Sequence, residues 1–163
     1  MEATWKRIVW QQFGAAIDML ENAIIACPEK LWSDRSQNPE FWYVAYHTLF
    51  WLDFYSSESS EGFSPPSPYT LDEMDPAGLI PERPYTKEEL RAYLEHGRRK
   101  CRAAIEALTD EGVSRLSEVR PSATVAELIL YNMRHVQHHA AQLNLILRQK
   151  TDSAPRWVAK AKD

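Results

Sequence analysis

The segment from Phe41 to Phe54 constrains the fold most, because almost every one of its side chains is apolar or aromatic. Phe, Trp, Tyr and Val also favour strands, so a strand is a rival interpretation of this segment. Its length and the absence of a period-two alternation favour a helix that begins near Asn38-Pro39 and ends near Ser57. A helix that is apolar around most of its circumference should be the most buried helix of the molecule.

Three further helices are predicted from apolar residues spaced three and four apart and from signals at the helix ends. The first covers about residues 3–26 and ends before Pro28, because the residue before a proline disfavours the helical conformation. The other two begin at capping boxes, in which Thr86 and Thr124 are each followed three residues later by Glu. They run to about residues 108 and 149.

Between the second and third helices lies a long connection, residues 56–85, which is rich in Pro and Ser and holds at most a short helical turn near residues 71–74. Such a loop is either a lid over a binding site or a crossover along the length of a helical bundle, and both interpretations stay open. No strand is expected, so the fold class is all-α. The simplest arrangement is a four-helix bundle at residues 1–150, followed by a polar tail at residues 151–163.

The charge pattern excludes several classes of function. The chain carries 19 basic and 23 acidic residues, a net charge of −4, without a long run of either sign. A nucleic-acid-binding protein would show a clustered basic face, so no nucleic-acid partner is expected. No apolar stretch is long enough to span a membrane, and the first residues lack the apolar core of a signal peptide. Cys27 and Cys101 form no CxxC motif, which indicates a reduced, cytoplasmic setting.

Histidines are the residues that point to chemistry. His135 and His139 are four residues apart and are predicted to share the inward face of the last helix. His47 lies in the apolar second helix, where an unpaired imidazole would cost roughly 1–3 kcal/mol. A single divalent metal ion bound by all three would give each a partner. The alternative for His47 is a core histidine bonded to a backbone carbonyl or to Asn132.

Three histidine ligands suit zinc or nickel, with iron, cobalt or manganese as alternatives, and leave a coordination position open for an exogenous ligand. A di-iron carboxylate site would need Glu-x-x-His on two helices and a zincin would need His-Glu-x-x-His, and neither motif occurs. His138 points about 100° away from His139 around the helix and is expected at the rim of the site. His138, Asn132 and Tyr131 are the candidate catalytic residues, whereas His96 is expected to be solvated.

The motifs around these histidines resemble those of the DinB-like superfamily. One histidine opens the apolar stretch HTLFWLDFY, and a late HxxHHxxQL motif occupies residues 135–143. Members commonly have GQ where this chain has Ala141-Gln142, a departure that removes no ligand. The resemblance covers roughly residues 3–149 and implies an up-down-down-up four-helix bundle with a long connection between the second and third helices. It also implies a metal site at His47, His135 and His139.

The resemblance implies functions as well. Relatives of known activity are metal-dependent S-transferases or isomerases that use a low-molecular-weight thiol, and many relatives are dimers. The first hypothesis is therefore a homodimeric S-transferase, in which a metal-ionised thiol attacks a small-molecule substrate held under the loop at residues 56–85. A hydrolase variant would use metal-bound water instead. The second hypothesis is a non-catalytic, stress-associated module that binds a metal or ligand, and the third is a structural bundle whose histidines bind no metal.

Overall fold

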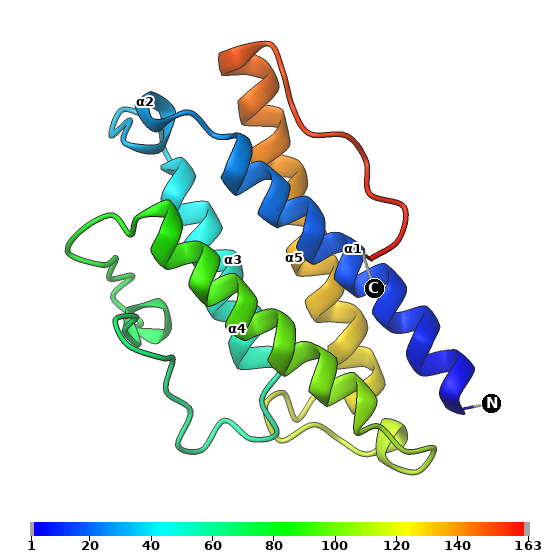
Figure 1. The fold of residues 1–163 in the computed structure, drawn as a ribbon. Helices are drawn as coiled ribbons and strands as arrows, with labels where there is room; N and C mark the ends of the chain where they lie inside the picture. Colours follow the sequence, from blue (N-terminus) through cyan, green and yellow to red (C-terminus); the bar gives the residue numbers. More distant parts are fainter. Residues whose placement is uncertain (1, 162–163) are drawn as a thin grey trace.

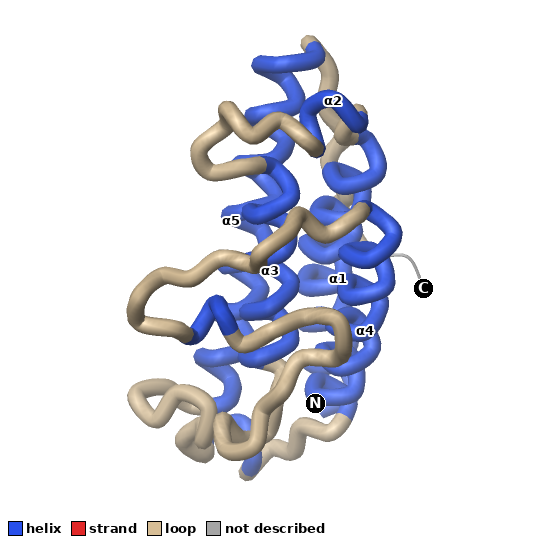
Figure 2. The backbone as a smooth tube through the Cα atoms, turned by 90° about the vertical axis from the view of Figure 1, so that its left-hand side faces the viewer, coloured by secondary structure: helices blue, strands red, loops and turns tan. Residues whose placement is uncertain are grey.

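The computed structural model describes residues 2–161, which form helices joined by loops (Figures 1 and 2). In chain order the helices are α1 (Glu2–Ala26), α2 (Glu29–Trp32), α3 (Phe41–Tyr55), η1 (Asp72–Met74), α4 (Lys87–Glu106), η2 (Gly112–Ser114) and α5 (Val125–Thr151). Within residues 2–161 there is no strand, apart from one isolated bridge between Leu116 and Thr124. The all-α prediction is confirmed.

The four long helices pack side by side. α1 contacts both α4 and α5, and α3 contacts the same two helices. In Figure 1, α1 and α5 run upward whereas α3 and α4 run downward. Because α3 and α4 run in the same direction, the chain must return along the length of the helices between them. The connection at residues 56–86 does so over the outside of the molecule (Figure 2), and it contains the short helix η1 near the predicted position.

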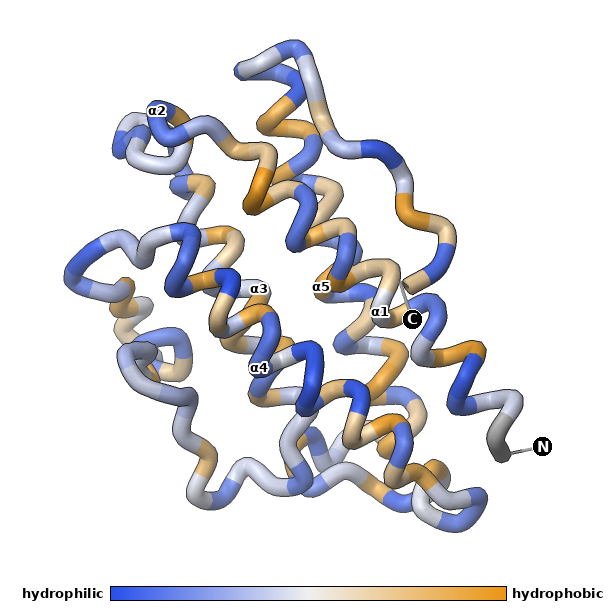
Figure 3. The backbone as a smooth tube through the Cα atoms, in the orientation of Figure 1, coloured by the Kyte–Doolittle hydropathy of each residue, from blue (hydrophilic) through white to orange (hydrophobic). Residues whose placement is uncertain are grey.

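α3 supplies much of the core, as its apolar sequence predicts. Its largest side chains, among them Trp42, Tyr46 and Phe50, are almost fully buried. In α4 the apolar residues recur at helical spacing among charged ones (Figure 3), and Leu90, Tyr93 and Leu94 are buried. At Gly97 a Cβ atom would lie 3.0 Å from Cδ2 of Leu52, so the glycine allows a close approach of α4 to α3.

The ends of the helices follow the predicted signals in two cases and depart from them in a third. Both capping boxes are formed, at the start of α4 and at the start of α5. α3, however, begins at Phe41 and not at Pro39, because Glu40 is extended and acts as the residue before the helix. The Glu40 carboxylate accepts a hydrogen bond from Trp42 Nε1 at 2.8 Å and pairs with Arg35 at 3.1 Å. Those contacts hold Glu40 at the helix entrance.

The C-terminal segment folds back onto the first helix. Asp152 has a φ of 55° and reverses the chain after α5. Beyond it, the backbone N–H of Ala161 donates to Gln11 O at 2.9 Å, and that of Val158 to Met19 Sδ at 3.3 Å. Trp157 is 69% exposed. Among the described residues, no helix has the length and apolar character needed to cross a lipid bilayer.

Candidate metal centre

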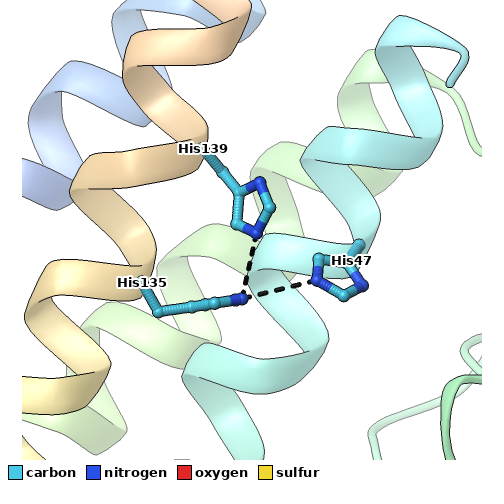
Figure 4. Close-up of side chains that lie close together, drawn as sticks. All are labelled: His47, His135 and His139. Atoms are coloured by element: carbon cyan, nitrogen blue, oxygen red, sulfur yellow. Dashed lines mark hydrogen bonds between the residues drawn. The ribbon is translucent and has the colours of Figure 1, made fainter.

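Three histidine side chains meet between α3 and α5 (Figure 4). His47 comes from α3, and His135 and His139 come from successive turns of α5. The Nε2 atom of His135 lies 3.4 Å from His47 Nε2 and 3.1 Å from His139 Nε2. All three side chains are half-buried, and their ligand atoms lie within 4.8 Å of one another. The structure therefore brings together the three residues expected to bind a metal.

These spacings match those of two ligands on one ion. With metal–nitrogen bonds of about 2.0–2.1 Å and tetrahedral angles, two ligand nitrogens are separated by about 3.3 Å. The observed separations of 3.4 Å and 3.1 Å bracket this value. Imidazole nitrogens that approach so closely need either a shared proton or a shared cation.

The hydrogen bonds of the Nδ1 atoms show whether shared protons can satisfy all three Nε2 atoms or whether a cation is needed. His47 Nδ1 lies 2.6 Å from a carboxylate oxygen of Glu73, and His139 Nδ1 lies 2.7 Å from Oε1 of Gln142. Both oxygens are acceptors, so both Nδ1 atoms carry the proton and both Nε2 atoms present a lone pair. His135 Nε2 can donate a proton to only one of them. One Nε2 lone pair then has no donor within the cluster, a defect that a cation at the common point would remove.

The electrostatic setting keeps the imidazoles in the form that binds metals. Burial, followed by the proximity of the other histidines, lowers the pKa of His135 to about 3. Burial also lowers the pKa of His139. At neutral pH both rings are therefore neutral, and only a neutral imidazole offers its nitrogen to a metal ion.

Glu73 is the residue beside the histidine cluster that the sequence alone did not reveal. It belongs to η1 in the long loop, and its side chain is only 3% exposed. Burial by itself would raise the pKa of this carboxyl, but hydrogen bonds from His47 and Tyr43 outweigh burial and hold the pKa below its ordinary value. Trp51 Nε1 also donates to it, at 3.1 Å. The carboxylate is thus ionised and lies on the outer side of His47, where its negative charge would offset part of the charge of a cation bound by the three histidines.

The sequence feature that could have pointed to an acceptor such as Glu73 lies on α3 and not in the loop. Tyr43, His47 and Trp51 are spaced four residues apart and form one stripe of hydrogen-bond donors on α3. Such a stripe indicates that an acceptor lies over it. Nothing in the loop sequence distinguishes Glu73 from the other acidic residues that could have filled this place.

The candidate catalytic residues lie in different settings. His138 is exposed, its ring centroid is 5.1 Å from that of His139, and its Nε2 accepts from Gln142 at 3.1 Å. It therefore lies beside the three-histidine cluster, where the helical angle predicted it. Its part in any reaction stays a prediction.

Asn132 and Tyr131 contact α3 and the loop before α5. The buried Asn132 amide donates to Leu52 O at 3.2 Å and to Ser56 Oγ at 3.3 Å, which ties α5 to α3. The alternative interpretation of His47 made Asn132 its partner, and these hydrogen bonds of Asn132 show that it is not. The Tyr131 ring packs edge-on against Tyr55 at 5.3 Å. Catalytic roles for Asn132 and Tyr131 also stay predictions.

A pocket of about 660 Å³ lies between α5, α1 and the C-terminal segment, and His135 is the residue of the cluster that lines it. Its lining includes His135 and His138 from α5, Gln12 from α1 and the exposed Trp157 from the C-terminal segment. Arg134 adds a positive charge to the wall. The pocket therefore offers a small molecule aromatic side chains and a cation beside one of the three histidines.

Comparison with known protein families identifies the family of this chain. The sequence model that describes the DinB superfamily matches residues 12–143, which contain α3 and α4 in full, most of α1 and α5, and every histidine of the cluster. No curated protein and no solved structure matches the sequence.

Proposed function

Because the chain belongs to the DinB superfamily, we propose that it binds one divalent transition metal ion through His47, His135 and His139 and acts as a metal-dependent thiol S-transferase. The four long helices would then be the up-down-down-up bundle of this family. Zinc and nickel suit three imidazole nitrogens best, with iron, cobalt and manganese as alternatives.

The observation that carries the proposal is the convergence of three Nε2 atoms, of which at least two present lone pairs, at separations that suit one ion. Three protein ligands leave a tetrahedral ion with one open position, the arrangement typical of catalytic sites. When bound, the ion would supply the positive charge that favours the thiolate form of an incoming thiol.

The chain's own thiols do not suit the role of nucleophile. Cys27 and Cys101 are both buried, and burial raises the pKa of each to about 12. A thiol with so high a pKa is almost entirely protonated at neutral pH, and the thiolate is the form that attacks. The sulfur would therefore come from a low-molecular-weight thiol in solution.

In the proposed reaction, the thiol sulfur bonds to an electrophilic carbon of a small substrate, and the leaving group departs with its electron pair. The thiol proton passes to solvent. The substrate would occupy the pocket between α5, α1 and the C-terminal segment, where Arg134 and Trp157 offer it charge and aromatic contact beside His135. No residue of the loop at 56–85 lines this pocket, so this position differs from the one under the loop that the sequence suggested. His138 and Tyr131, which also line this pocket, would orient it. Homodimerisation, implied by the family resemblance, is part of the same proposal and is checked by the mass of the protein in solution.

Metal analysis tests the metal-binding half of the proposal. Protein purified without a histidine tag should contain about one equivalent of metal, and His135→Ala should lower the affinity for zinc by more than about 100-fold, since loss of an outer-shell partner alone costs about 10–100-fold. His138→Ala removes an exposed neighbouring imidazole and serves as the matched control, which should keep its metal. Absence of metal from the wild type, even after incubation with zinc or nickel, would contradict the proposal.

Activity is tested separately, on metal-loaded protein, with a small thiol and a halogenated aromatic electrophile. Metal-dependent loss of the thiol, abolished in His135→Ala, would support the S-transferase. Stoichiometric metal without thiol consumption would favour the non-catalytic module. Hydrolysis of an ester in the absence of thiol would favour the hydrolase.

A further inference from the structure

One acidic side chain connects the long loop to the histidine cluster. Glu73, in η1, directs its carboxylate at α3 and leaves only 3% of its side chain exposed. By contrast, its neighbours Leu71 and Met74 are 47% and 43% exposed. The part of η1 that is buried against the helices is therefore the charged one, and apolar packing of these neighbours does not hold η1 in place.

The carboxylate of Glu73 docks onto three successive turns of α3. His47 Nδ1 lies 2.6 Å from it and Trp51 Nε1 lies 3.1 Å from it. Tyr43, one turn before His47, also stabilises its ionised form. All three donors lie on the stripe of α3 that faces the loop. Of these donors, His47 alone also belongs to the three-histidine cluster.

The rest of the loop is tied to the helices independently of Glu73. The Tyr46 hydroxyl donates to Thr70 O at 3.1 Å, and the Tyr69 hydroxyl donates to the backbone of Glu89 in α4. These bonds hold the chain on the N-terminal side of η1. What Glu73 adds is a contact between η1 itself and a predicted metal ligand.

We propose that Glu73 couples the long loop to the metal centre: its contact with His47 holds the Nε2 lone pair toward the other two histidines, so that metal binding and the docked conformation of η1 stabilise each other. This inference rests on the metal binding proposed above. It makes Glu73 a positioning residue, since it acts through His47 and lies on the side of the ring away from the common point.

The size of the coupling follows from two general relations. Loss of a carboxylate that holds a metal-binding histidine typically costs about 10–100-fold in metal affinity. By thermodynamic reciprocity, the factor by which the docked loop raises metal affinity equals the factor by which metal favours the docked loop. Both measurements should therefore return the same factor of about 10–100.

The first experiment compares zinc affinity in three proteins by competition with a chromophoric chelator. Glu73→Gln preserves the size of the side chain, but its amide can also donate to His47 Nδ1 and thereby move the ring proton to Nε2. Asp75→Asn is the matched control: it removes the same charge two residues away and keeps the oxygen that accepts from Ala77 N. We expect Glu73→Gln to bind zinc about 10–100-fold more weakly, and Asp75→Asn to stay within about twofold of the wild type.

The second experiment uses wild-type protein and needs no variant. The backbone N–H groups of Met74 and Asp75 donate to Leu71 O and Asp72 O, so their hydrogen exchange reports on η1 directly. Saturation with zinc should slow the exchange of these two amides by about 10–100-fold. The same measurement on Glu73→Gln, also saturated with zinc, should show little slowing.

The outcomes separate this inference from the proposed function. Wild type that binds zinc, together with unchanged affinity in Glu73→Gln or unchanged exchange in η1, overturns the coupling and leaves the metal site intact. Equal losses of affinity in Glu73→Gln and Asp75→Asn overturn it as well, because loop charge alone would then explain both. Wild type that binds no metal overturns the proposed function and the inference together. Should Glu73→Gln fail to fold, the wild-type exchange experiment still decides.

Discussion

Two polar clusters lie on α3, and each pairs a histidine with a carboxylate. In the first, His47 contacts Glu73 from the loop and faces His135 and His139 of α5. In the second, Asp53 of α3 contacts His96 at 3.3 Å, with Lys100 and Tyr93, also of α4, donating to the same carboxylate. The residue types are alike, but the two clusters are arranged in opposite ways.

In the second cluster every donor converges on the carboxylate. Asp53 is fully buried, and its negative charge is compensated by Lys100 and satisfied by Tyr93. His96, which was expected to be solvated, has a side chain that is only 36% exposed and contacts Asp53, so that prediction was wrong in part. The reason is that α4 packs against α3 at this level and turns the ring toward the buried acid. No unsatisfied group is left for a ligand.

In the first cluster the carboxylate lies behind the histidine, and it is the acceptors that converge. His47 donates its Nδ1 proton to Glu73, and His139 donates its Nδ1 proton to Gln142. The Nε2 atoms of both rings therefore present lone pairs, and not protons, to the centre of the cluster. A buried cluster whose donors meet one acid stabilises the fold, whereas one whose acceptors meet at a point suits a cation. Which atoms face the centre, and not the residue types, separates a structural cluster from a candidate metal site.

The largest effect is expected in the second cluster. Lys100→Met keeps most of the aliphatic stem but leaves Asp53 as a fully buried charge without its cation. The free energy of unfolding should fall by about 3 kcal/mol, near the lower end for breaking a buried ion pair, because Tyr93 and His96 still donate. Urea unfolding of the metal-free protein measures it.

Its control is Lys150→Met, at an exposed position of α5, which should change stability by less than about 0.5 kcal/mol. Zinc affinity should be unchanged in both variants. A loss of zinc binding in Lys100→Met would mean that the two clusters are not independent. It would contradict the division into a structural cluster at Asp53 and a separate metal site at His47.

The next effect concerns His135, whose buried Nδ1 has no partner among the described residues. At free zinc of 100 times the dissociation constant, wild-type protein should gain about 2.7 kcal/mol of stability. His135→Leu should gain almost none, while its metal-free stability stays within about 1 kcal/mol of the wild type, because an unsatisfied polar group is replaced by an apolar one. Urea unfolding with and without zinc gives both numbers, and an equal zinc-dependent gain in His135→Leu would remove this cluster as the binding site.

The smallest effect concerns the caps of the two helices that partner α3. Thr86 caps α4, which carries Tyr93 and Lys100, and Thr124 caps α5, which carries the two α5 histidines. Thr86→Ala and Thr124→Ala should each lower the free energy of unfolding by about 1 kcal/mol. The caps lie at opposite ends of the molecule (Figure 1), so the two losses should add in the double variant. A more than tenfold loss of zinc affinity in Thr124→Ala would show that the site depends on the end of α5.

Local signals account for what could be predicted. The capping boxes at Thr86 and Thr124 place two helix starts correctly, because a capping box involves only residues three apart. The start of α3 was misplaced at Pro39, because contacts of the Glu40 side chain hold that residue at the entrance. The four-residue helix α2 was not expected. Segments of one turn have too few residues for a period to be visible.

The three histidines could be named from the sequence because their signal was also local. A spacing of four placed His135 and His139 on one face of a helix, and the apolar surroundings of His47 marked it as a polar group in need of a partner. Family resemblance pointed to the same three residues. The residues around the three histidines could not be predicted in this way, because neither the position of Glu73 nor the contacts of Gln142 and Asn132 follow from any spacing in the sequence.

By itself, then, the amino-acid sequence determined that the described chain is helical and which three histidines would meet, because helical periodicity and burial act over a few residues. Only the tertiary structure decided that Glu73 lies behind His47, that Gln142 lies behind His139, and that Asp53 collects its donors in a separate cluster. The physical reason is the path of the chain. A loop of some thirty residues has no period that fixes which of its acids reaches a helix, so the partner of His47 depends on how the loop crosses from α3 to α4.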